Sequence, residues 1–495
     1  MPCILAIDQS TSATKALLFE TDGRLVDKEA LDHRQHYPQA GWVEHDAGEI
    51  WSNTLTSLRT LLQRQAGRVS EIAGLSITNQ RETIVIFERS TGRPLYPAIV
   101  WQCRRSESLC AAQVAAGQEK LVHTRTGLKI DPYFSGSKLQ WLVRHHPDLR
   151  TKLEAGEALI GTIDTYLIYR LTRGAVFATD STNASRTLLF DIQRLTWDED
   201  LCALWEVPMR ALPEVRESFA HFGDTTLDGI LVKSLPICGV MGDSQAALFA
   251  QGCFAPGTAK VTFGTGSSIL LNIGSQPKLS EGGVVTTLAW VRNGVPVYAF
   301  EGIIISSAST LTWLRDRLGM ATDVAQLEQL AIAAPDNGGV YLVPAFTGLG
   351  LPHWRPDVRA SLTGLSSHSD RRHVARAAFE SIAFQIKDAL DALRRDAGVP
   401  FGALHGDGGP SSSRFLMQLT ADLAGTELCV ADMPDCSPLG AVLAGQLGLG
   451  LHRTFADIAL DRRAVTTYRP ALPAERVAAL RNGWQHAVRQ TLLSR

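Results

Sequence analysis

Several features that define other classes of protein are missing from this chain of 495 residues. No apolar run approaches the ~18 residues that a membrane-spanning helix needs. Basic and acidic residues nearly balance, so the net charge is only -2. They form no basic stripe of the kind that binds nucleic acid or an anionic membrane. We therefore expect neither nucleic acid nor a membrane as a partner.

The sequence also lacks the signals of secretion. Its eight cysteines form no CxxC pair and no Cys/His spacing typical of a metal site. They are typical of reduced, mostly buried thiols. The opening residues, MPCILAIDQS, contain no cationic leader like that of a signal peptide. These observations together predict a cytoplasmic protein.

The commonest nucleotide-binding and hydrolase motifs are absent as well. There is no GxxxxGK[ST] phosphate loop and no GxGxxG dinucleotide fingerprint. There is also no GxSxG and no HExxH, which excludes the commonest serine hydrolases and zinc proteases. If the chain binds phosphate, it does so with turns of another kind.

What is present is a long alternation of strand and helix patterns. The length favours two domains, and the alternation favours α/β layers. Strands are predicted at residues 71–78, 83–88 and 98–102, and amphipathic helices at 47–65 and 371–396. No low-complexity segment or Pro/Ser-rich linker separates two halves.

Two predicted hairpins have small polar residues at their turns. The first, ILAIDQSTSATKALLFETDG, covers residues 4–23, and the second, GTAKVTFGTGSSILLNIG, covers 257–274. Between them, a break near 246–257 divides the chain into a predicted first domain, 1–250, and a second, 251–495. The recurrence favours a duplicated fold that holds one ligand between its halves.

The turn residues are of the types that bind phosphate. Backbone N–H groups and hydroxyls hold phosphate in turns without bulky side chains, and a nearby carboxylate can hold the Mg²⁺ that bridges phosphates. Asp8 and Thr11 fit these roles in the first hairpin, and Gly264-Thr265-Gly266 in the second. A third segment, DGGPSSS at 407–413, precedes a predicted helix. One polar turn alone is usually only a turn, but the repetition favours function.

A second group of polar residues follows predicted strands. Arg81 and Glu82 lie between two strands, Trp101 follows a third, Tyr133 lies in IDPYFSG, and Asp243 stands at a strand-to-helix turn. Such residues can bracket the hydroxyls of a small polyol and cover its C–H faces, and a lone carboxylate can accept a proton. Each also has a simpler interpretation, namely a surface turn, a core aromatic or a helix N-cap.

Longer motifs resemble those of the FGGY family of carbohydrate kinases, and among them most closely the glycerol kinases. The motifs are AIDQSTSATKALLF, TNQRETIVIFERSTGRPLYPAIVWQCRR, TGLKIDPYFSG, TDSTNASRTLLFDI, GDSQAALFAQG, FGTGSS and DGGPSSSRFLMQL. The resemblance implies two actin-like (ribonuclease H-like) ATPase domains of α/β class with an interdomain cleft. It implies ATP- and Mg²⁺-dependent phosphorylation of a small polyol, glycerol to glycerol 3-phosphate first of all. A homodimer or homotetramer is compatible with it.

The same resemblance implies roles for particular residues. Asp243 corresponds to the general base, and Asp8 to the residue that holds the metal. The polyol-binding positions correspond to Arg81, Glu82, Trp101, Tyr133, Asp243 and Ser244. The nucleotide-binding positions correspond to Thr11, Lys15, Thr265, Ala308, Thr312, Gly409 and Ser413.

Several positions depart from the glycerol kinase pattern, among them Ala308, Thr312 and Ser413 on the nucleotide side. Lys15 replaces an Arg, Ser244 replaces a Gln beside the polyol, and Ser268 replaces an aromatic residue. Two small side chains beside the polyol leave open a longer polyol or a ketose, such as erythritol or xylulose, as substrate. A non-catalytic sensor and a plain ATPase are less favoured. A sensor would be free to lose Asp8 or Asp243, and an ATPase needs no polyol cluster.

Overall fold

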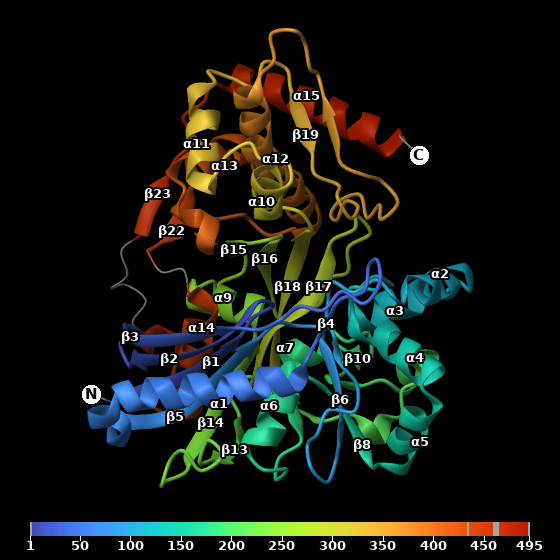
Figure 1. Ribbon diagram of the computed structural model, residues 1–495, viewed down its shortest axis with the longest axis vertical. Coiled ribbons are helices and arrows are strands. Elements are labelled where there is room, and N and C mark those ends of the chain that lie inside the picture. Colours follow the sequence, from blue (N-terminus) through green and yellow to red (C-terminus); the bar gives the residue numbers. More distant parts are fainter. Residues whose placement is uncertain (1, 433–434, 459–464, 494–495) are drawn as a thin grey trace.

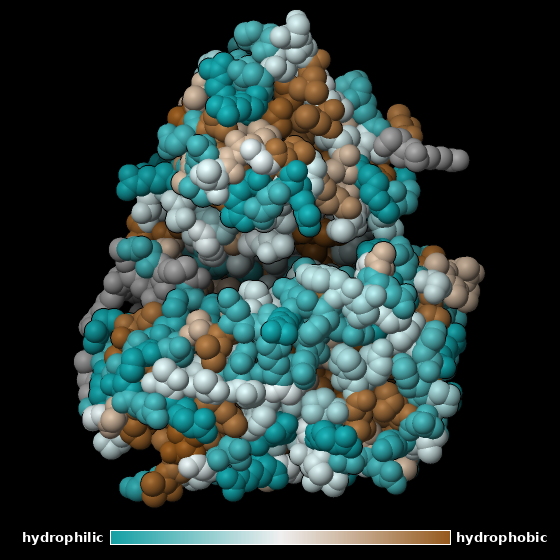
Figure 2. Space-filling view, viewed as in Figure 1, coloured by the Kyte–Doolittle hydropathy of each residue, from teal (hydrophilic) through white to brown (hydrophobic). Residues whose placement is uncertain are grey.

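The computed structural model describes residues 2–432, 435–458 and 465–493. It consists of two lobes, one formed mainly by the first half of the chain and one by the second (Figure 1). The surface is recessed along the line where the lobes meet (Figure 2). None of the helices in these described residues is long and apolar enough to cross a membrane.

The first lobe contains a six-stranded sheet whose strands β5, β1 and β2 are almost entirely buried. Its order is β13(His221–Thr225), β14(Leu235–Gly242), β5(Ile72–Asn79), β1(Cys3–Gln9), β2(Ala13–Glu20) and β3(Leu25–Asp32). The predicted first hairpin is confirmed as β1–β2.

The second lobe contains a seven-stranded sheet. Its order is β17(Val285–Arg292), β18(Val295–Ile304), β16(Ser267–Gly274), β15(Ala259–Phe263), β21(Leu404–Asp407), β22(Leu428–Ala431) and β23(Val465–Tyr468). The predicted second hairpin is confirmed as β15–β16.

The two sheets share one connectivity. In the first, β1 pairs antiparallel with β2 and parallel with β5, and β14 continues parallel before β13 closes the edge antiparallel. In the second, β15 pairs antiparallel with β16 and parallel with β21, and β22 continues parallel before β23 closes antiparallel. The predicted duplicated α/β fold is therefore present, with β17 as an extra edge strand.

A smaller four-stranded sheet extends the first lobe, in the order β4(Glu44–His45), β7(Ala98–Ile99), β6(Ile84–Glu88) and β8(Ala158–Thr162). The strand predicted at 98–102 is shorter than expected, so Trp101 lies in the turn that follows it. Two-stranded pairs complete the strands: β9(Ala178–Asp180) with β12(Glu214–Arg216), β10(Phe190–Asp191) with β11(Thr196–Trp197), and β19(Tyr341–Val343) with β20(Ser361–Thr363).

The helices cover these sheets. Those of the first half are α1(Ala47–Arg64), α2(Glu107–Ala115), α3(Glu119–Thr126), α4(Ser135–His145), α5(Pro147–Ala155), α6(Ile163–Leu171), α7(Ser181–Ala184), α8(Glu199–Leu204) and α9(Asp243–Ala250). Those of the second half are α10(Ala308–Asp316), α11(Val324–Ala333), α12(Arg371–Ala397), α13(Arg414–Ala424), α14(Cys436–Gly448) and α15(Ala474–Leu493). The two helices predicted from periodicity are confirmed as α1 and α12. Capping sets the bounds of α12, since Asp370 accepts from the Arg372 N–H and Gly398 ends the helix in the left-handed conformation.

Helix α14 does not cover the sheet of its own half. It packs against β14, β5 and β1 of the first sheet and against α9, and it is drawn in red within the first lobe in Figure 1. On β1, Leu5 and Ile7 face α1 and α6, whereas Ile4 and Ala6 face α9 and α14. The division at residues 250 and 251 stays a prediction, and α14 crosses it in space.

Candidate functional site

The charged residues of the predicted polyol site come from the ends of two neighbouring strands. Arg81 and Glu82 form the turn after β5, where Glu82 adopts φ 62°, a conformation uncommon outside glycine. Asp243 follows β14, the strand parallel to β5, and is the first residue of α9. Gly242 is the N-cap of that helix, so the alternative of Asp243 as the cap residue is wrong. Parallel strands end at one edge of the sheet and bring these residues together.

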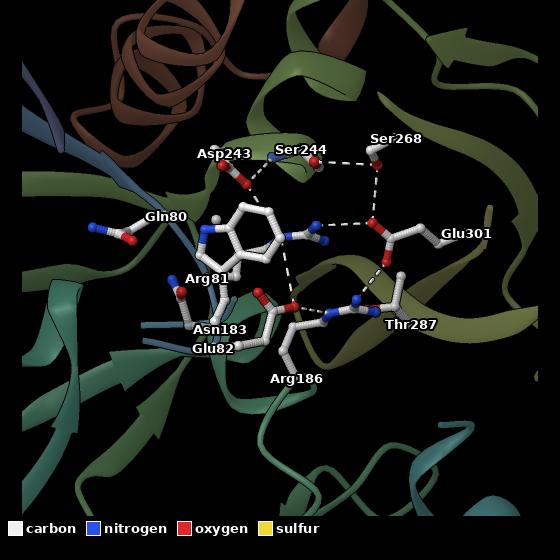
Figure 3. Close-up of polar contacts among 12 residues, drawn as sticks. Gln80, Arg81, Glu82, Asn183, Arg186, Asp243, Ser244, Ser268, Thr287 and Glu301 are labelled. Carbon is white, nitrogen blue, oxygen red and sulfur yellow. Dashed lines mark hydrogen bonds and ion pairs between the residues drawn. The ribbon is translucent and has the colours of Figure 1, made fainter. Parts of the chain in front are cut away.

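Arg81 lies at the centre of the site (Figure 3). Its Nε is 3.1 Å from Asp243 Oδ1, its Nη2 is 2.8 Å from Glu301 Oε1, and its Nη1 donates to Gln245 Oε1 at 3.2 Å. Glu82 Oε1 lies 4.0 Å from Arg81 Nε. A buried guanidinium that contacts three oxygen-bearing side chains is held in one orientation.

Two charged residues of this network were not identified from the sequence. Arg186 donates from Nε to Glu82 Oε1 at 2.7 Å, and its Nη2 lies 2.6 Å from Glu301 Oε2. In the sequence, Glu301 interrupts the apolar run VPVYAFEGIII. That interruption was the available signal, since a carboxylate inside an apolar strand requires a buried cation. Its partner Arg81 is 220 residues away in the chain.

The carboxyl groups around Arg81 differ in pKa and in exposure. Burial alone would raise the pKa of the Glu301 carboxyl, but the guanidinium groups of Arg186 and Arg81 outweigh it and lower that pKa to about 2. Burial raises the pKa of Glu82, and this effect outweighs the lowering by Arg81 at 4.0 Å and Arg186 at 2.7 Å. The side chains of Glu82 and Glu301 are 2% and 0% exposed, whereas that of Asp243 is 40% exposed. Among the three, Asp243 is the carboxylate most exposed to a ligand.

Two aromatic rings and two hydroxyls complete the polyol side of the site. The rings of Trp101 and Tyr133 are 5.3 Å apart between centroids, and both are partly buried. Ser268 Oγ donates to Glu301 Oε1 at 2.9 Å, and Ser244 Oγ donates to Ser268 Oγ at 3.3 Å. The two departures from the glycerol kinase pattern therefore contact each other and join the charged network.

The first hairpin places Asp8 and Lys15 beside each other. Lys15 Nζ donates to Asp8 Oδ2 at 3.0 Å and to Asp435 Oδ1 at 3.1 Å, and Lys28 Nζ donates to Asp435 Oδ2 at 2.7 Å. Burial raises the pKa of Asp8, partly offset by Lys15. Asp435 precedes α14 and was not identified from the sequence, since nothing local links it to a hairpin 420 residues earlier.

The second hairpin is held by backbone contacts. The Gly264 N–H donates to the Gly266 carbonyl at 2.9 Å, and the Ala308 N–H donates to the Gly264 carbonyl at 3.0 Å. A Cβ on Gly266 would lie 2.5 Å from the Ile304 carbonyl oxygen, so this turn admits no side chain there. The Thr265 carbonyl accepts from the N–H groups of Ser307 and Ser309.

The remaining predicted nucleotide-binding residues differ in whether other groups of the protein already occupy their hydrogen-bonding atoms. Thr312 Oγ1 donates to the Ala308 carbonyl within α10 at 3.3 Å. A Cβ on Gly409 would meet nothing within 4 Å, so space for a ligand adjoins that residue. Ser413 caps α13 by accepting from the Leu416 N–H, and its hydroxyl donates to Glu328. Ser413 thus already has a structural use.

No group of three or more His, Cys, Asp or Glu able to hold a metal ion occurs among the described residues. This fits Mg²⁺ that arrives with a nucleotide, because such Mg²⁺ usually needs only one or two protein carboxylates besides phosphates and waters. Asp8, buried at the first hairpin, is a carboxylate of that kind.

Comparisons with known proteins agree with this architecture. Residues 3–250 match the model of the FGGY family of carbohydrate kinases, N-terminal domain, and residues 259–449 match the C-terminal domain. Glycerol kinase 1 of Thermotoga maritima is 43% identical over 492 residues, 99% of each chain. Glycerol kinase of Symbiobacterium thermophilum is 44% identical over 486 residues, 98% of this chain and 97% of that one.

Among solved structures, Plasmodium falciparum glycerol kinase with ADP superposes with a TM-score of 0.90 at 34% identity, covering 100% of this chain and 99% of that one. Xylulose kinase from Rhodospirillum rubrum, at 24% identity and a TM-score of 0.85 over 99% and 98% of the chains, shares the fold. The predicted two-domain fold and family are confirmed: the chain belongs to the FGGY family of carbohydrate kinases.

Proposed function

We propose that this protein transfers the γ-phosphoryl group of ATP to a hydroxyl of glycerol, forming glycerol 3-phosphate and ADP. The observation that carries the proposal is the position of Asp243. Its carboxylate is held by Arg81 at 3.1 Å, yet 40% of its side chain is exposed at the junction of the two lobes. Relatives about 43% identical over nearly the whole chain are glycerol kinases.

Different residues of the site would bind different parts of the polyol. Arg81 and Glu82 would hold hydroxyls of the polyol. Arg186 and Arg81 contact Glu82 at Oε1, and within the described part of the chain no hydrogen bond reaches Oε2, so Oε2 would accept from the polyol. Trp101 and Tyr133 would cover the C–H face of the polyol. Arg186 and Glu301 neutralise the cluster and fix Arg81, because an unpaired buried charge would be costly.

In the reaction, the bound hydroxyl oxygen attacks the γ-phosphorus while the bond to the β,γ-bridging oxygen breaks. Asp243 accepts the hydroxyl proton, and ADP leaves with the bridging oxygen. Phosphoryl transfer asks the protein chiefly for positioning and charge neutralisation, with one base near the acceptor. The small turn at Gly264–Gly266, together with Thr11 and Lys15, would hold the phosphates, and Gly409 would adjoin the adenine.

Asp8 is the residue that we propose holds Mg²⁺, which would neutralise charge on the phosphates. Lys15, which donates to Asp8 Oδ2, partly offsets the rise that burial causes in the pKa of Asp8. The compartment remains predicted as the cytoplasm, and a homodimer or homotetramer remains the proposed assembly.

The contact between Ser244 and Ser268 favours a second candidate, a longer polyol or ketose such as erythritol or xylulose. Two hydroxymethyl groups occupy little volume, and their oxygens can exchange hydrogen bonds with an additional substrate hydroxyl. Steric exclusion of one methylene is worth only ~1–3 kcal/mol, so glycerol and longer substrates would differ by a modest factor.

A coupled assay of ADP release, with Mg²⁺ and glycerol, erythritol, xylulose or no polyol, tests both candidates. We expect release to depend on a polyol and to stop when EDTA removes Mg²⁺, and mass spectrometry should detect glycerol 3-phosphate. ADP release at the same rate with and without a polyol would identify an ATPase and contradict the proposal. Nucleotide binding without release on any polyol would favour a sensor.

A further inference from the structure

The tip of the first hairpin, Ser10 to Ser12, is held from two directions. From outside, His33 donates from Nε2 to the Thr11 carbonyl at 2.9 Å, and its backbone N–H donates to the Ser12 carbonyl at 3.1 Å. From the polyol side, Trp101 Nε1 donates to Thr11 Oγ1 at 2.9 Å. A side chain assigned to the polyol therefore bonds directly to one assigned to the nucleotide.

The chemistry of this bond fixes the direction of the Thr11 hydroxyl. An indole N–H can only donate, so Thr11 Oγ1 must be the acceptor in this pair. A hydroxyl has a single hydrogen, and Thr11 Oγ1 donates it to no acceptor in the described part of the chain. The Thr11 hydrogen is consequently left for an acceptor outside the protein, and a phosphate oxygen is such an acceptor.

Trp101 is in turn fastened to the hairpin through its backbone. Its N–H donates to Thr83 Oγ1 at 3.2 Å, Thr83 Oγ1 donates to Gln80 Oε1 at 2.9 Å, and Gln80 Nε2 donates to Gln9 Oε1 at 3.0 Å. Thr83, Gln80 and Gln9 are buried. These hydrogen bonds link Trp101 to Gln9 through the turn beside Arg81 and Glu82, and the backbone from Gln9 to Thr11 closes the ring of contacts.

Trp101 and Thr11 are the partly exposed members of this ring of contacts, and the indole ring of Trp101 is the one on the polyol side. The Trp101 side chain is partly buried and packs against Tyr133 with the two rings tilted by 58°, so part of the ring can meet a ligand. A polyol against the ring would restrict its rotation and keep Nε1–H on Thr11. The same rotation, when the polyol is absent, would release the Thr11 hydroxyl to other orientations.

We propose that Trp101 couples the two substrate sites. Its ring contacts the polyol, and its Nε1–H orients the Thr11 hydroxyl toward the nucleotide phosphates, so that polyol binding strengthens nucleotide binding. The identity of the two ligands in this inference rests on the proposed function. The hydrogen bonds between Trp101, Thr11 and the hairpin are independent of it.

Calorimetric titration of Mg-ADP tests the proposal on the wild-type chain, Trp101→Phe, Thr11→Val and the double variant, each with and without saturating glycerol. Phenylalanine keeps an aromatic face and removes only the N–H donor. We expect each single variant to bind Mg-ADP about three- to tenfold more weakly, the usual range for one hydrogen bond. The double variant should be no weaker than Thr11→Val, and glycerol should strengthen Mg-ADP binding less in Trp101→Phe than in wild type.

Two controls make the result specific. Trp197→Phe removes another indole donor, which bonds the Pro213 carbonyl away from the site, and should leave Mg-ADP binding unchanged. Thr11→Ser keeps the hydroxyl and should restore most of the Mg-ADP affinity that Thr11→Val loses. Additive single effects, or a glycerol enhancement as large in Trp101→Phe as in wild type, would overturn the coupling. Absence of glycerol phosphorylation by the wild-type chain would instead refute the proposed function.

Discussion

The two hairpins that open the two sheets occupy equivalent places in one repeated topology, yet they are held by different means. In the first, side chains make most of the contacts: Lys15 with Asp8, Trp101 with Thr11, and His33 with the tip. In the second, backbone groups make most of them, from Gly264 to Gly266 and from Ala308 to Gly264, beside one side-chain bond from Ser267 to Ser307. The topology repeats, and the chemistry does not.

The difference indicates a division of labour between the halves. A turn tied by side chains responds to the groups around it, and here those groups include the polyol residues. A turn tied by its own backbone, with no room for a Cβ at Gly266, presents a fixed surface of amides. The first half is thus suited to couple two ligands, and the second to cradle one.

The largest expected effect comes from removing the exposed carboxylate of the first half. Asp243→Asn should lower turnover by ~10²–10⁴, the usual range for loss of a general base, because its amide cannot accept the hydroxyl proton. Mg-ADP binding should persist, since Asp243 is not part of either hairpin. Steady-state ADP release measures the turnover, and calorimetry measures Mg-ADP binding. Near-normal turnover would show that Asp243 is not the general base.

The next largest effect concerns Glu301, a residue of the second half that pairs with Arg81 and Arg186 of the first half. Glu301→Gln leaves Arg81 and Arg186 without their shared counter-charge, and removing one partner of a buried ion pair costs about 3–5 kcal/mol. Urea unfolding of the variant should therefore show a lower midpoint at pH 7. The exposed Glu281→Gln is the matched control and should leave the midpoint unchanged.

The same pair of proteins gives a pH signature. The folded-state pKa of Glu301, about 2, is below its unfolded value of 4.5, so its stabilisation is complete above pH 4.5 and is lost as pH falls toward 2. The difference in midpoint between wild type and Glu301→Gln should therefore narrow between pH 5 and pH 3. A difference that stays constant over this range would mean that Glu301 carries no depressed pKa.

A smaller effect concerns substrate choice at the contact between the halves. Ser268→Phe should shift preference toward glycerol over erythritol and xylulose, by up to ~1–3 kcal/mol, because the ring refills space beside the polyol. It also removes the hydrogen bond to Glu301, so Ser268→Ala, which loses that bond without filling the space, is the control. Equal selectivity in the two variants would show that the hydroxyl, and not the volume, sets the preference.

The smallest effect sharpens the description of the backbone-held hairpin. Gly266→Ala places a methyl group 2.5 Å from the Ile304 carbonyl oxygen, and relieving such overpacking costs about 1 kcal/mol or somewhat more. Mg-ADP should bind about fivefold more weakly. Gly67→Ala, where a Cβ meets nothing within 4 Å, should bind normally. If both variants bind alike, the tight turn at Gly266 is not part of the nucleotide site.

Much of this arrangement was predictable from the sequence, and the failures have a common cause. Both hairpins, α1 and α12 follow from local periodicity and turn residues, and Arg81, Glu82 and Asp243 follow from polar residues at strand ends. Glu301, Arg186 and Asp435 were missed because their partners are distant in the chain. Local patterns identify an isolated charge, but only the tertiary structure identifies what neutralises it. The role of the Trp101 N–H was missed for the same reason.

The placement of α14 has a consequence for biosynthesis. Ile4, Ala6, Leu17 and Phe19 on the first sheet are covered by α9 and by a helix that begins only at residue 436. While the ribosome is still translating the second half, the part of this apolar face that α14 covers in the finished fold is therefore still exposed. Once α14 arrives, Gly440 and Gly445 allow an approach so close that a Cβ on Gly440 would lie 1.8 Å from the Ala246 carbonyl oxygen. Folding of the first lobe is completed by nearly the last part of the chain to be synthesised, so a prematurely terminated chain would expose this face to aggregation and proteolysis.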